Sequence, residues 1–150
     1  MLHGYILSII HECTHLKLEK LVYMCYAEYL CEYKASLFKD RIYAYKFGPV
    51  VKSVYDKYKK YGYRAIDEKA IKIDILEMPA RSRILFAENG IEKLKTIDKT
   101  LESYGKYSAS DLVTITHKEM TPWSFTGKGL LRDKVITNDT ILKYHCNEKI

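Results

Sequence analysis

The residues best suited to acid–base chemistry stand together as His117-Lys118-Glu119, shortly before the single tryptophan, Trp123. A positioned His and Glu can transfer protons, but catalysis also needs a nucleophile and a stabilising group in one cleft. No Ser, Cys or Asp stands in a recognised catalytic context. We therefore expect a buried His117 bonded to the backbone, a Trp123 that anchors the C-terminal helix, and no enzymatic activity.

A metal centre is the second chemistry that the sequence raises, because His11, Cys13 and His15 alternate. A structural zinc site needs four ligands, and the fourth would have to be Cys146 or His145, folded back from the far end of the chain. No P-loop, GxGxxG or zinc-finger spacing occurs. We predict that the chain holds no metal and no cofactor.

The four cysteines form no CxxC pair, so the sequence predicts no disulfide framework and suits a reducing cytosol. The longest apolar run, 21–30, contains Glu28 and is too short to span a bilayer. The first residues lack the basic region and cleavage site of a signal peptide. With 150 residues, 47% hydrophobic and 29% charged, we expect one soluble, cytoplasmic domain.

Nucleic acid is a possible partner because the net charge is +6 and basic residues alternate with tyrosines at 55–64. On a helix, however, these tyrosines fall mainly on the apolar stripe and the lysines on the solvated face. The chain has 14 Tyr against 4 Phe. Tyrosine suits binding surfaces and half-buried packing alike, so both interpretations stay open.

The strongest helical pattern in the chain follows Thr14, which can cap a helix. Apolar residues recur there at i, i+3, i+4 and i+7, and further apolar residues fill most of the remaining faces. Such a helix is predicted to be the buried central one, ending near Tyr33. A shorter helical pattern over 2–10 precedes it.

Around Gly48-Pro49 the sequence predicts a change from strand to helix. Alternating residues within 38–46 indicate a short strand. Pro49 suits the first position of a helix, where its missing N–H costs nothing. That helix is predicted to run to about Tyr61 and to end at Gly62 in a left-handed cap.

The C-terminal half is predicted to be helical. Apolar spacing marks a helix over 91–104, and Ser108 with Asp111 forms a capping box for another that reaches about Glu119. Asn138 can cap a last helix. Before these, alternation over 71–75 predicts a strand that pairs with the first one.

The predicted fold class is therefore mainly α with a minor β part. We expect a single compact domain of about five to seven helices, with a small β-hairpin or short strands near 38–46 and 70–77.

Three motifs then stand in order along the chain: Leu18-Glu-Lys-Leu-Val-Tyr23, Ala44-Tyr-Lys-Phe-Gly-Pro-Val50, and Thr116-His-Lys-Glu119 with Pro122-Trp123. Together they resemble the Panacea domain, the SocA-like, phage-associated antitoxin domain of bacterial toxin–antitoxin systems. The resemblance covers nearly the whole chain, 1–150. Its structural motif residues are Leu18, Lys20, Leu21, Tyr23, Gly48, Pro49, His117 and Trp123.

The chain departs from the family pattern at three positions. Glu19 stands where the family usually has Gln, Cys25 where it often has Ala, and Tyr45 where Trp is common. None of them removes a Gly, Pro or capping residue. Many relatives carry a fused domain that selects the toxin, whereas this chain is nearly all core, so we expect partner recognition within the core.

The resemblance implies a largely helical antitoxin, encoded beside a toxin and often on a mobile element. Such antitoxins neutralise their toxins by protein contact. The toxins include translation inhibitors, among them synthetases resembling the alarmone enzymes. Our lead hypothesis is therefore a cognate toxin from the same operon, bound so that its active site or substrate entrance is covered. The residues we expect at this partner-binding surface are Tyr45, Phe47, Gly48, Pro49, Val50, Lys52, Tyr55, Lys59, Ile73 and Trp123.

Three alternatives stay open at this point. The chain can be a nucleic-acid-binding regulator, whose binding would weaken steeply with salt. It can be an adaptor that delivers the toxin to a protease, as the resemblance implies for some relatives. It can also be an enzyme of unknown reaction, which replacement of His117 or Glu119 would inactivate without unfolding it.

Overall fold

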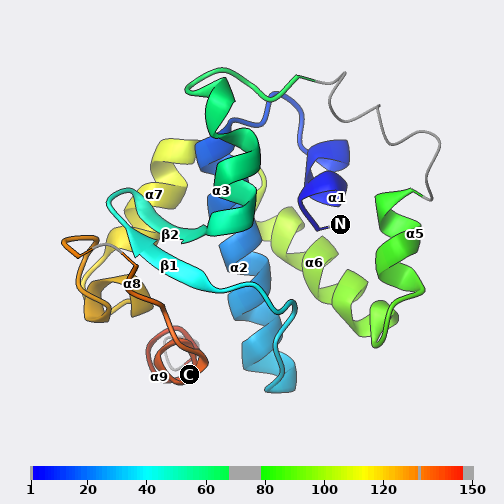
Figure 1. Cartoon of the computed structure of the whole chain (residues 1–150). Helices are drawn as coiled ribbons and strands as arrows, with labels where there is room; N and C mark the ends of the chain where they lie inside the picture. The colour runs from blue at the N-terminus through cyan, green and yellow to red at the C-terminus, as the bar shows by residue number, and fades with distance from the viewer. Residues whose placement is uncertain (1, 68–78, 132, 147–150) are drawn as a thin grey trace.

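The computed structural model describes residues 2–67, 79–131 and 133–146. Within them the chain is mainly helical, with one two-stranded antiparallel hairpin (Figure 1). The elements in order are α1 Leu2–Ile9, α2 His15–Tyr33, β1 Ile42–Tyr45, β2 Gly48–Val51, α3 Lys52–Tyr58, the 3-10 turn η1 Lys59–Tyr61, α5 Ala80–Leu85, α6 Gly90–Tyr104, α7 Ala109–His117, α8 Pro122–Phe125 and α9 Asn138–Tyr144. The predicted fold class is confirmed.

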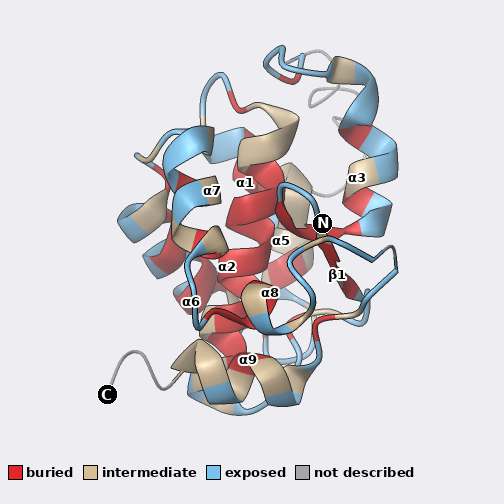
Figure 2. Cartoon of the chain, turned by 90° about the vertical axis from the view of Figure 1, so that its left-hand side faces the viewer, coloured by how far each residue is buried: buried red, intermediate tan, exposed pale blue. Residues whose placement is uncertain are grey.

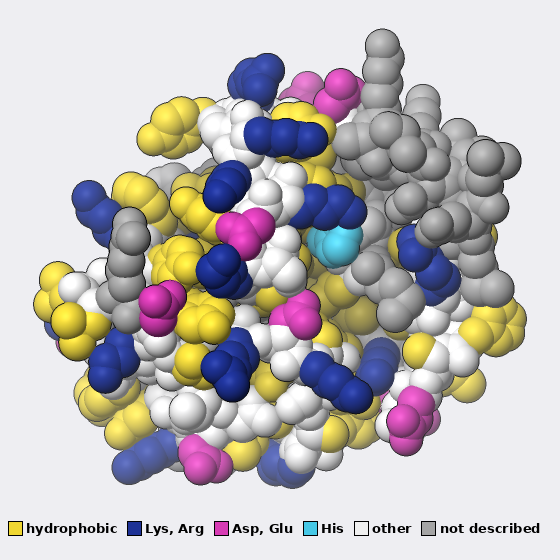
Figure 3. Space-filling view, viewed as in Figure 1, with side chains coloured by type: hydrophobic (Ala, Val, Ile, Leu, Met, Phe, Trp, Pro, Cys, Tyr) yellow, Lys and Arg dark blue, Asp and Glu magenta, His cyan; other side chains and the backbone are white. Residues whose placement is uncertain are grey.

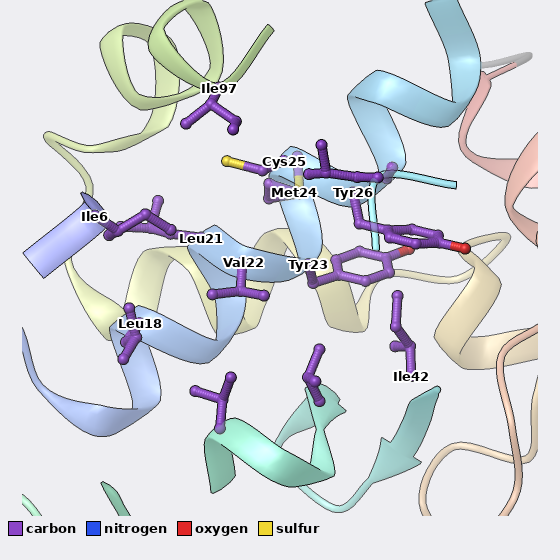
Figure 4. Close-up of a cluster of buried hydrophobic side chains, with 14 of the residues drawn as sticks. Ile6, Leu18, Leu21, Val22, Tyr23, Met24, Cys25, Tyr26, Ile42 and Ile97 are labelled. Atoms are coloured by element: carbon purple, nitrogen blue, oxygen red, sulfur yellow. The ribbon is translucent and has the colours of Figure 1, made fainter. Parts of the chain in front are cut away.

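Helix α2 is the centre of the molecule, as its all-round apolar pattern predicts. The Thr14 hydroxyl accepts a hydrogen bond from the Lys17 N–H at 3.2 Å and caps the helix. Its other end is closed by Lys34 in the left-handed conformation. Helices α1, α6, α7 and α9 and strand β2 all pack against it. Figure 2 shows α2 buried along most of its length, and Figure 4 shows the apolar side chains around it.

The hairpin differs from the sequence prediction in its second strand. The predicted helix start at Pro49 is wrong, because Pro49 lies in β2, opposite Ala44 of β1, and α3 begins only at Lys52. A proline is tolerated on this edge strand because its missing N–H faces away from the ladder. The predicted partner strand at 70–77, including Ile73, lies outside the described residues.

Tertiary contacts explain why this segment is extended. The Glu19 carboxylate accepts the Val51 N–H at 2.9 Å, and the Lys20 ammonium donates to the Pro49 carbonyl at 2.7 Å. Both acceptor and donor come from α2, so the buried helix holds the strand through its backbone. Two buried hydrogen bonds to charged groups stabilise the extended backbone more than the preference of proline for a helix start stabilises a helix.

Three further boundaries refine the predictions. The capping box of Ser108 and Asp111 is confirmed, although α7 ends at His117 rather than Glu119. Thr137, not Asn138, caps α9. The helical segment after the hairpin ends at Tyr61, as predicted, with η1 as its last turn, but the predicted left-handed cap at Gly62 is wrong, because its φ is 57° and its ψ is −124°.

The expectation that the cysteines form no disulfide is wrong. Cys31, on α2, is bonded to Cys146, just after α9, with 5.4 Å between their Cα atoms. The pairing joins residues 115 apart in sequence, which spacing alone does not reveal. Separately, none of the helices in the described part of the chain has the length and apolar character that crossing a membrane requires.

Candidate functional site

The hairpin is held from one side by the buried helix α2. Lys20 is fully buried, and its ammonium binds the Pro49 carbonyl. Gly48, at φ +111°, lies directly on the Lys20 side chain: a Cβ there would be 2.7 Å from the Lys20 Cε. Burial lowers the pKa of Lys20 to about 8, although the neighbouring Glu19 carboxylate opposes this shift. The first two motifs therefore meet here, because the Lys20 side chain of one contacts the Gly48-Pro49 backbone of the other.

The turn of the hairpin is held by the third motif. The Trp123 indole N–H donates to the Tyr45 carbonyl at 2.7 Å, and the His117 Nε2 lies 3.0 Å from the Lys46 carbonyl oxygen. The two rings meet edge to face, with centroids 3.9 Å apart. Burial lowers the pKa of His117. A neutral His117 then donates through Nε2 to the carbonyl.

These contacts confirm one expectation and correct one. His117 is bonded to the backbone as expected, but it is half-buried rather than buried. Trp123 holds the hairpin turn, and the short helix that carries it, α8, also packs against the last helix, α9. We call Lys20, His117 and Trp123 the anchoring residues, because each fixes the hairpin through a main-chain carbonyl.

The other side of the hairpin opens onto a pocket of about 750 Å³, which we call the hairpin pocket. It lies between the hairpin, the first turn of α2, the α3–η1 segment and the loop around 129–133. Its lining residues are His15, Leu16, Glu19, Ala44, Tyr45, Lys46, Phe47, Val50, Lys52, Tyr55, Asp56, Lys59, Gly62, Tyr63, Gly129, Leu131 and Asp133. On the face seen in Figure 3, hydrophobic side chains gather left of the centre among charged ones.

The structure brings most of the predicted partner-binding residues to this one pocket, namely Tyr45, Phe47, Val50, Lys52, Tyr55 and Lys59. Gly48, Pro49 and Trp123 are buried instead. Sequence reasoning missed further lining residues near these positions, and it missed the contributions of α2 and of the 129–133 loop altogether. His15 and Glu19 are four apart on a helix and so share a face, a signal that was available; nothing in the sequence placed the loop.

The wall of the pocket is aromatic. The rings of Tyr45 and Tyr55 meet edge to face at 5.5 Å between centroids, and the His15 ring lies 5.1 Å from that of Tyr55. Both tyrosines are half-buried. Rings fixed in this way lose little conformational freedom when they bind a partner, which is why tyrosine is favoured at interfaces.

Comparison with known proteins gives the chain a family. Residues 18–124 match the family described as "Antitoxin SocA-like, Panacea domain". The chain belongs to this antitoxin family. It is also 32% identical over 122 residues to the protein named Antitoxin SocA of Caulobacter vibrioides (strain NA1000 / CB15N). That match covers 77% of this chain but 61% of the relative's own length. No solved structure matches the chain.

In this Panacea domain the charges of the pocket rim are partly paired with one another. The Asp56 carboxylate binds the ammonium groups of Lys52 at 2.9 Å and Lys59 at 3.6 Å. Its pKa is lowered, chiefly by the hydrogen bond from Lys52. As the helical projection predicts, Tyr58 is buried and Lys57 is exposed. Lys52 and Lys59, however, line the hairpin pocket together with Tyr55, so the separation of basic and aromatic side chains is only partial.

Apolar side chains project around the mouth of the pocket. Phe47 is 57% exposed, Leu131 59% and Tyr63 96%. Exposed apolar groups gathered around a concavity are typical of binding surfaces rather than of a solvated face. A second exposed apolar pair, Phe86 and Ile91, lies at the α5–α6 turn on the other side of the molecule (Figure 1).

The predicted absence of a metal concerns His11, Cys13 and His15. Among the described residues, no three His, Cys, Asp or Glu side chains are grouped so that they can hold a metal ion. The Cys13 thiol is buried, which raises its pKa to about 11. The thiolate is the form that binds metals, so this environment opposes coordination.

Proposed function

We propose that this antitoxin-family chain is not an enzyme and that it neutralises a cognate toxin by direct protein–protein binding. The surface used is the hairpin pocket with its exposed rim, and it covers the toxin's active site or substrate entrance. The observation that carries the proposal is that one pocket, bordered by a hairpin that the anchoring residues hold in place, gathers half-buried tyrosines, exposed apolar residues and lysines. The toxin encoded beside this chain is the partner, and both act in the cytoplasm.

The anchoring residues support binding because they order the surface before the partner arrives. A preorganised loop loses less conformational entropy on association, so more of the contact energy appears as affinity. A standard interface buries about 800 Å² on each partner, so the contact must extend from the pocket over neighbouring residues. Tyr45 and Tyr55 serve as rigid anchors, as aromatic hot-spot residues do elsewhere.

The candidate acid–base pair supports a role without catalysis. His117 is used in holding the Lys46 carbonyl, whereas the Glu119 side chain is 78% exposed and pairs with Lys128 at 2.7 Å. The two groups therefore do not converge on one site. The family resemblance favours a toxin that inhibits translation, with synthetases resembling the alarmone enzymes as one such class.

The test is co-expression with the protein encoded beside this chain, read by bacterial growth and by co-purification. Two matched double variants locate the surface. Phe47→Glu with Leu131→Glu places charges on the rim of the hairpin pocket. Phe86→Glu with Ile91→Glu places the same charges on another exposed apolar pair, away from the pocket.

We expect the wild-type chain and the Phe86/Ile91 variant to restore growth and to retain the toxin on a column. The Phe47/Leu131 variant should do neither, although circular dichroism should show it folded. A wild-type chain that neither restores growth nor co-purifies with the neighbouring protein would refute direct neutralisation. If the two variants affect growth and co-purification equally, the hairpin pocket is not the binding surface.

A further inference from the structure

We propose that the floor of the hairpin pocket receives an arginine side chain of the toxin, with Glu19 as its counter-charge and acidic residues flanking that arginine. This inference rests on the proposed function, since it names the chemistry of the group that the same pocket binds. It starts from a buried carboxylate that is only half satisfied.

Glu19 has two oxygens with different surroundings. Oε2 accepts the Val51 N–H at 2.9 Å, and this bond fixes the hairpin. Oε1 is buried and has no hydrogen-bond partner among the described residues, although the side chain is only 1% exposed. The nearest candidate, the His15 Nε2, lies 3.6 Å away, which is too far for a hydrogen bond, and this nitrogen is itself unpartnered in the described part of the chain.

An unpartnered carboxylate oxygen in a folded interior is unfavourable, and natural proteins rarely keep one without a reason. Because Glu19 and His15 both line the hairpin pocket, a ligand that enters the pocket can reach them. Neither atom is open to solvent in the unbound chain, so the His15 ring must turn aside to admit the ligand. Only 11% of that side chain is exposed, and its ring packs against the Tyr55 ring, 5.1 Å away.

The chain's own cations near the pocket are occupied elsewhere. Lys52 and Lys59 pair with Asp56 on α3, and Lys20 donates to the Pro49 carbonyl. The Lys46 ammonium lies over the Phe47 ring, 5.6 Å from its centroid. The donor that completes Glu19 is therefore expected from outside the chain.

A guanidinium group fits this site better than an ammonium group. It carries five N–H donors and no acceptor, so one group can bond the carboxylate and a second acceptor in the pocket together. It is planar and more weakly hydrated than lysine, so it enters an aromatic pocket at lower cost and stacks on rings such as those of Tyr45 and Tyr55.

The rim defines the surroundings of that arginine on the toxin. Three exposed lysines, Lys46, Lys52 and Lys59, line the pocket against two exposed carboxylates, Asp56 and Asp133, so positive charge is in excess at the rim. A toxin surface of matching charge has acidic residues around one protruding arginine. The lysines of the rim then speed the encounter with the acidic residues of the toxin, and the pairing of Glu19 with the arginine gives specificity.

The experiment uses the chain alone and two synthetic peptides, so that it is independent of the toxin. One peptide is acetyl-Glu-Ala-Arg-Ala-Glu-amide, and the other has citrulline, the neutral isostere, in place of arginine. Binding is followed by amide chemical shifts in NMR titrations. We expect the arginine peptide to shift the signals of His15, Glu19 and Tyr55 and to bind about tenfold more tightly than the citrulline peptide.

Two variants test the carboxylate. Glu19→Gln keeps an oxygen for the Val51 N–H but loses the charge, and should reduce the arginine peptide's affinity to that of the citrulline peptide. Glu102→Gln, on the exposed face of α6, should change nothing. Thermal unfolding shows whether the Glu19→Gln variant is folded. If this variant does not fold, the comparison of the two peptides on the wild-type chain still tests the inference.

Equal affinity for the two peptides, no binding of either, or shifts confined to other residues would overturn the inference. A chain that restores growth against the toxin but ignores the arginine peptide keeps the proposed function and loses only this assignment. Failure of both experiments refutes the two proposals together.

Discussion

The two sides of the hairpin use their residues in opposite ways. On one side the anchoring residues Lys20, His117 and Trp123 reach main-chain carbonyls and are buried or half-buried. On the other side Phe47 is exposed, and Tyr55 is half-buried on the wall of a pocket. The anchoring residues thus build a scaffold, while the side chains next to them in sequence line the pocket.

This division has a physical consequence for specificity. The hydrogen bonds from Lys20, His117 and Trp123 end on carbonyl oxygens, which every residue type provides. Side chains on the pocket side can therefore change without breaking these bonds. A scaffold of this kind allows one fold to recognise different partners. This agrees with the general rule that function depends on the residues of a site and not on the fold alone.

The largest effect is expected from Lys20→Ala. It leaves a cavity in the centre of the molecule and the Pro49 carbonyl without its donor, so the free energy of unfolding should fall by about 3–5 kcal/mol. Urea unfolding followed by circular dichroism measures the loss. Lys95→Ala, at an exposed position of α6, is the control and should change stability by less than about 0.5 kcal/mol. Similar losses in both variants would contradict an anchoring role.

A smaller loss, about 1–3 kcal/mol, is expected from Gly48→Ala, because a φ of +111° strains any residue with a Cβ. The new Cβ would also press on the Lys20 side chain. Gly127→Ala is the matched control, since Gly127 has a φ of +93° but no atom near its Cβ position. The difference between the two unfolding midpoints isolates the contact with Lys20. If Gly127→Ala lowers the stability more than Gly48→Ala does, the contact with Lys20 does not determine the loss.

On the pocket side the effect should appear in binding rather than in stability. Phe47→Ala removes an exposed ring, so the unfolding free energy should change by less than about 0.5 kcal/mol. The Kd for the toxin, measured by titration calorimetry, should rise about tenfold if Phe47 is an interface anchor. Phe86→Ala, which truncates an exposed ring at the α5–α6 turn, should leave that Kd unchanged. The reverse order would place the interface at the α5–α6 turn.

The smallest effect is a pH dependence of the anchoring side. The pKa of Lys20 is about 8 in the folded chain, against an ordinary value of 10.5. Between these values the unfolded chain holds the proton that the folded chain has released, so stability from Lys20 rises with pH. The stability gap between the wild-type chain and Lys20→Ala should widen by about 1 kcal/mol from pH 8 to pH 9. A constant or shrinking gap would show that Lys20 is not held in this buried state.

Sequence reasoning succeeded where periodicity and capping determine structure. The all-round apolar pattern after Thr14 predicted the buried helix α2, and Ser108 with Asp111 predicted the start of α7. It failed at Pro49, because the side chains that hold β2 extended lie about thirty residues earlier on α2. Local propensity has no access to such a contact.

The site was predictable only in part, for the same reason. Tyr45, Phe47 and Tyr55 are close in sequence, and the hairpin and α3 bring them together. The contributions of Glu19 and of the 129–133 loop depend on how distant segments pack. The Cys31–Cys146 bond likewise joins two distant parts of the chain that only the tertiary structure places side by side.

Hydrogen exchange of the chain, free and bound to its toxin, tests the central claim most directly. Binding through the hairpin pocket should slow exchange of the backbone amides at 45–47 and 52–63. The amides at 86–91, in the α5–α6 turn, should exchange at the same rate with and without the toxin. Protection at 86–91 with none at the hairpin would contradict the account.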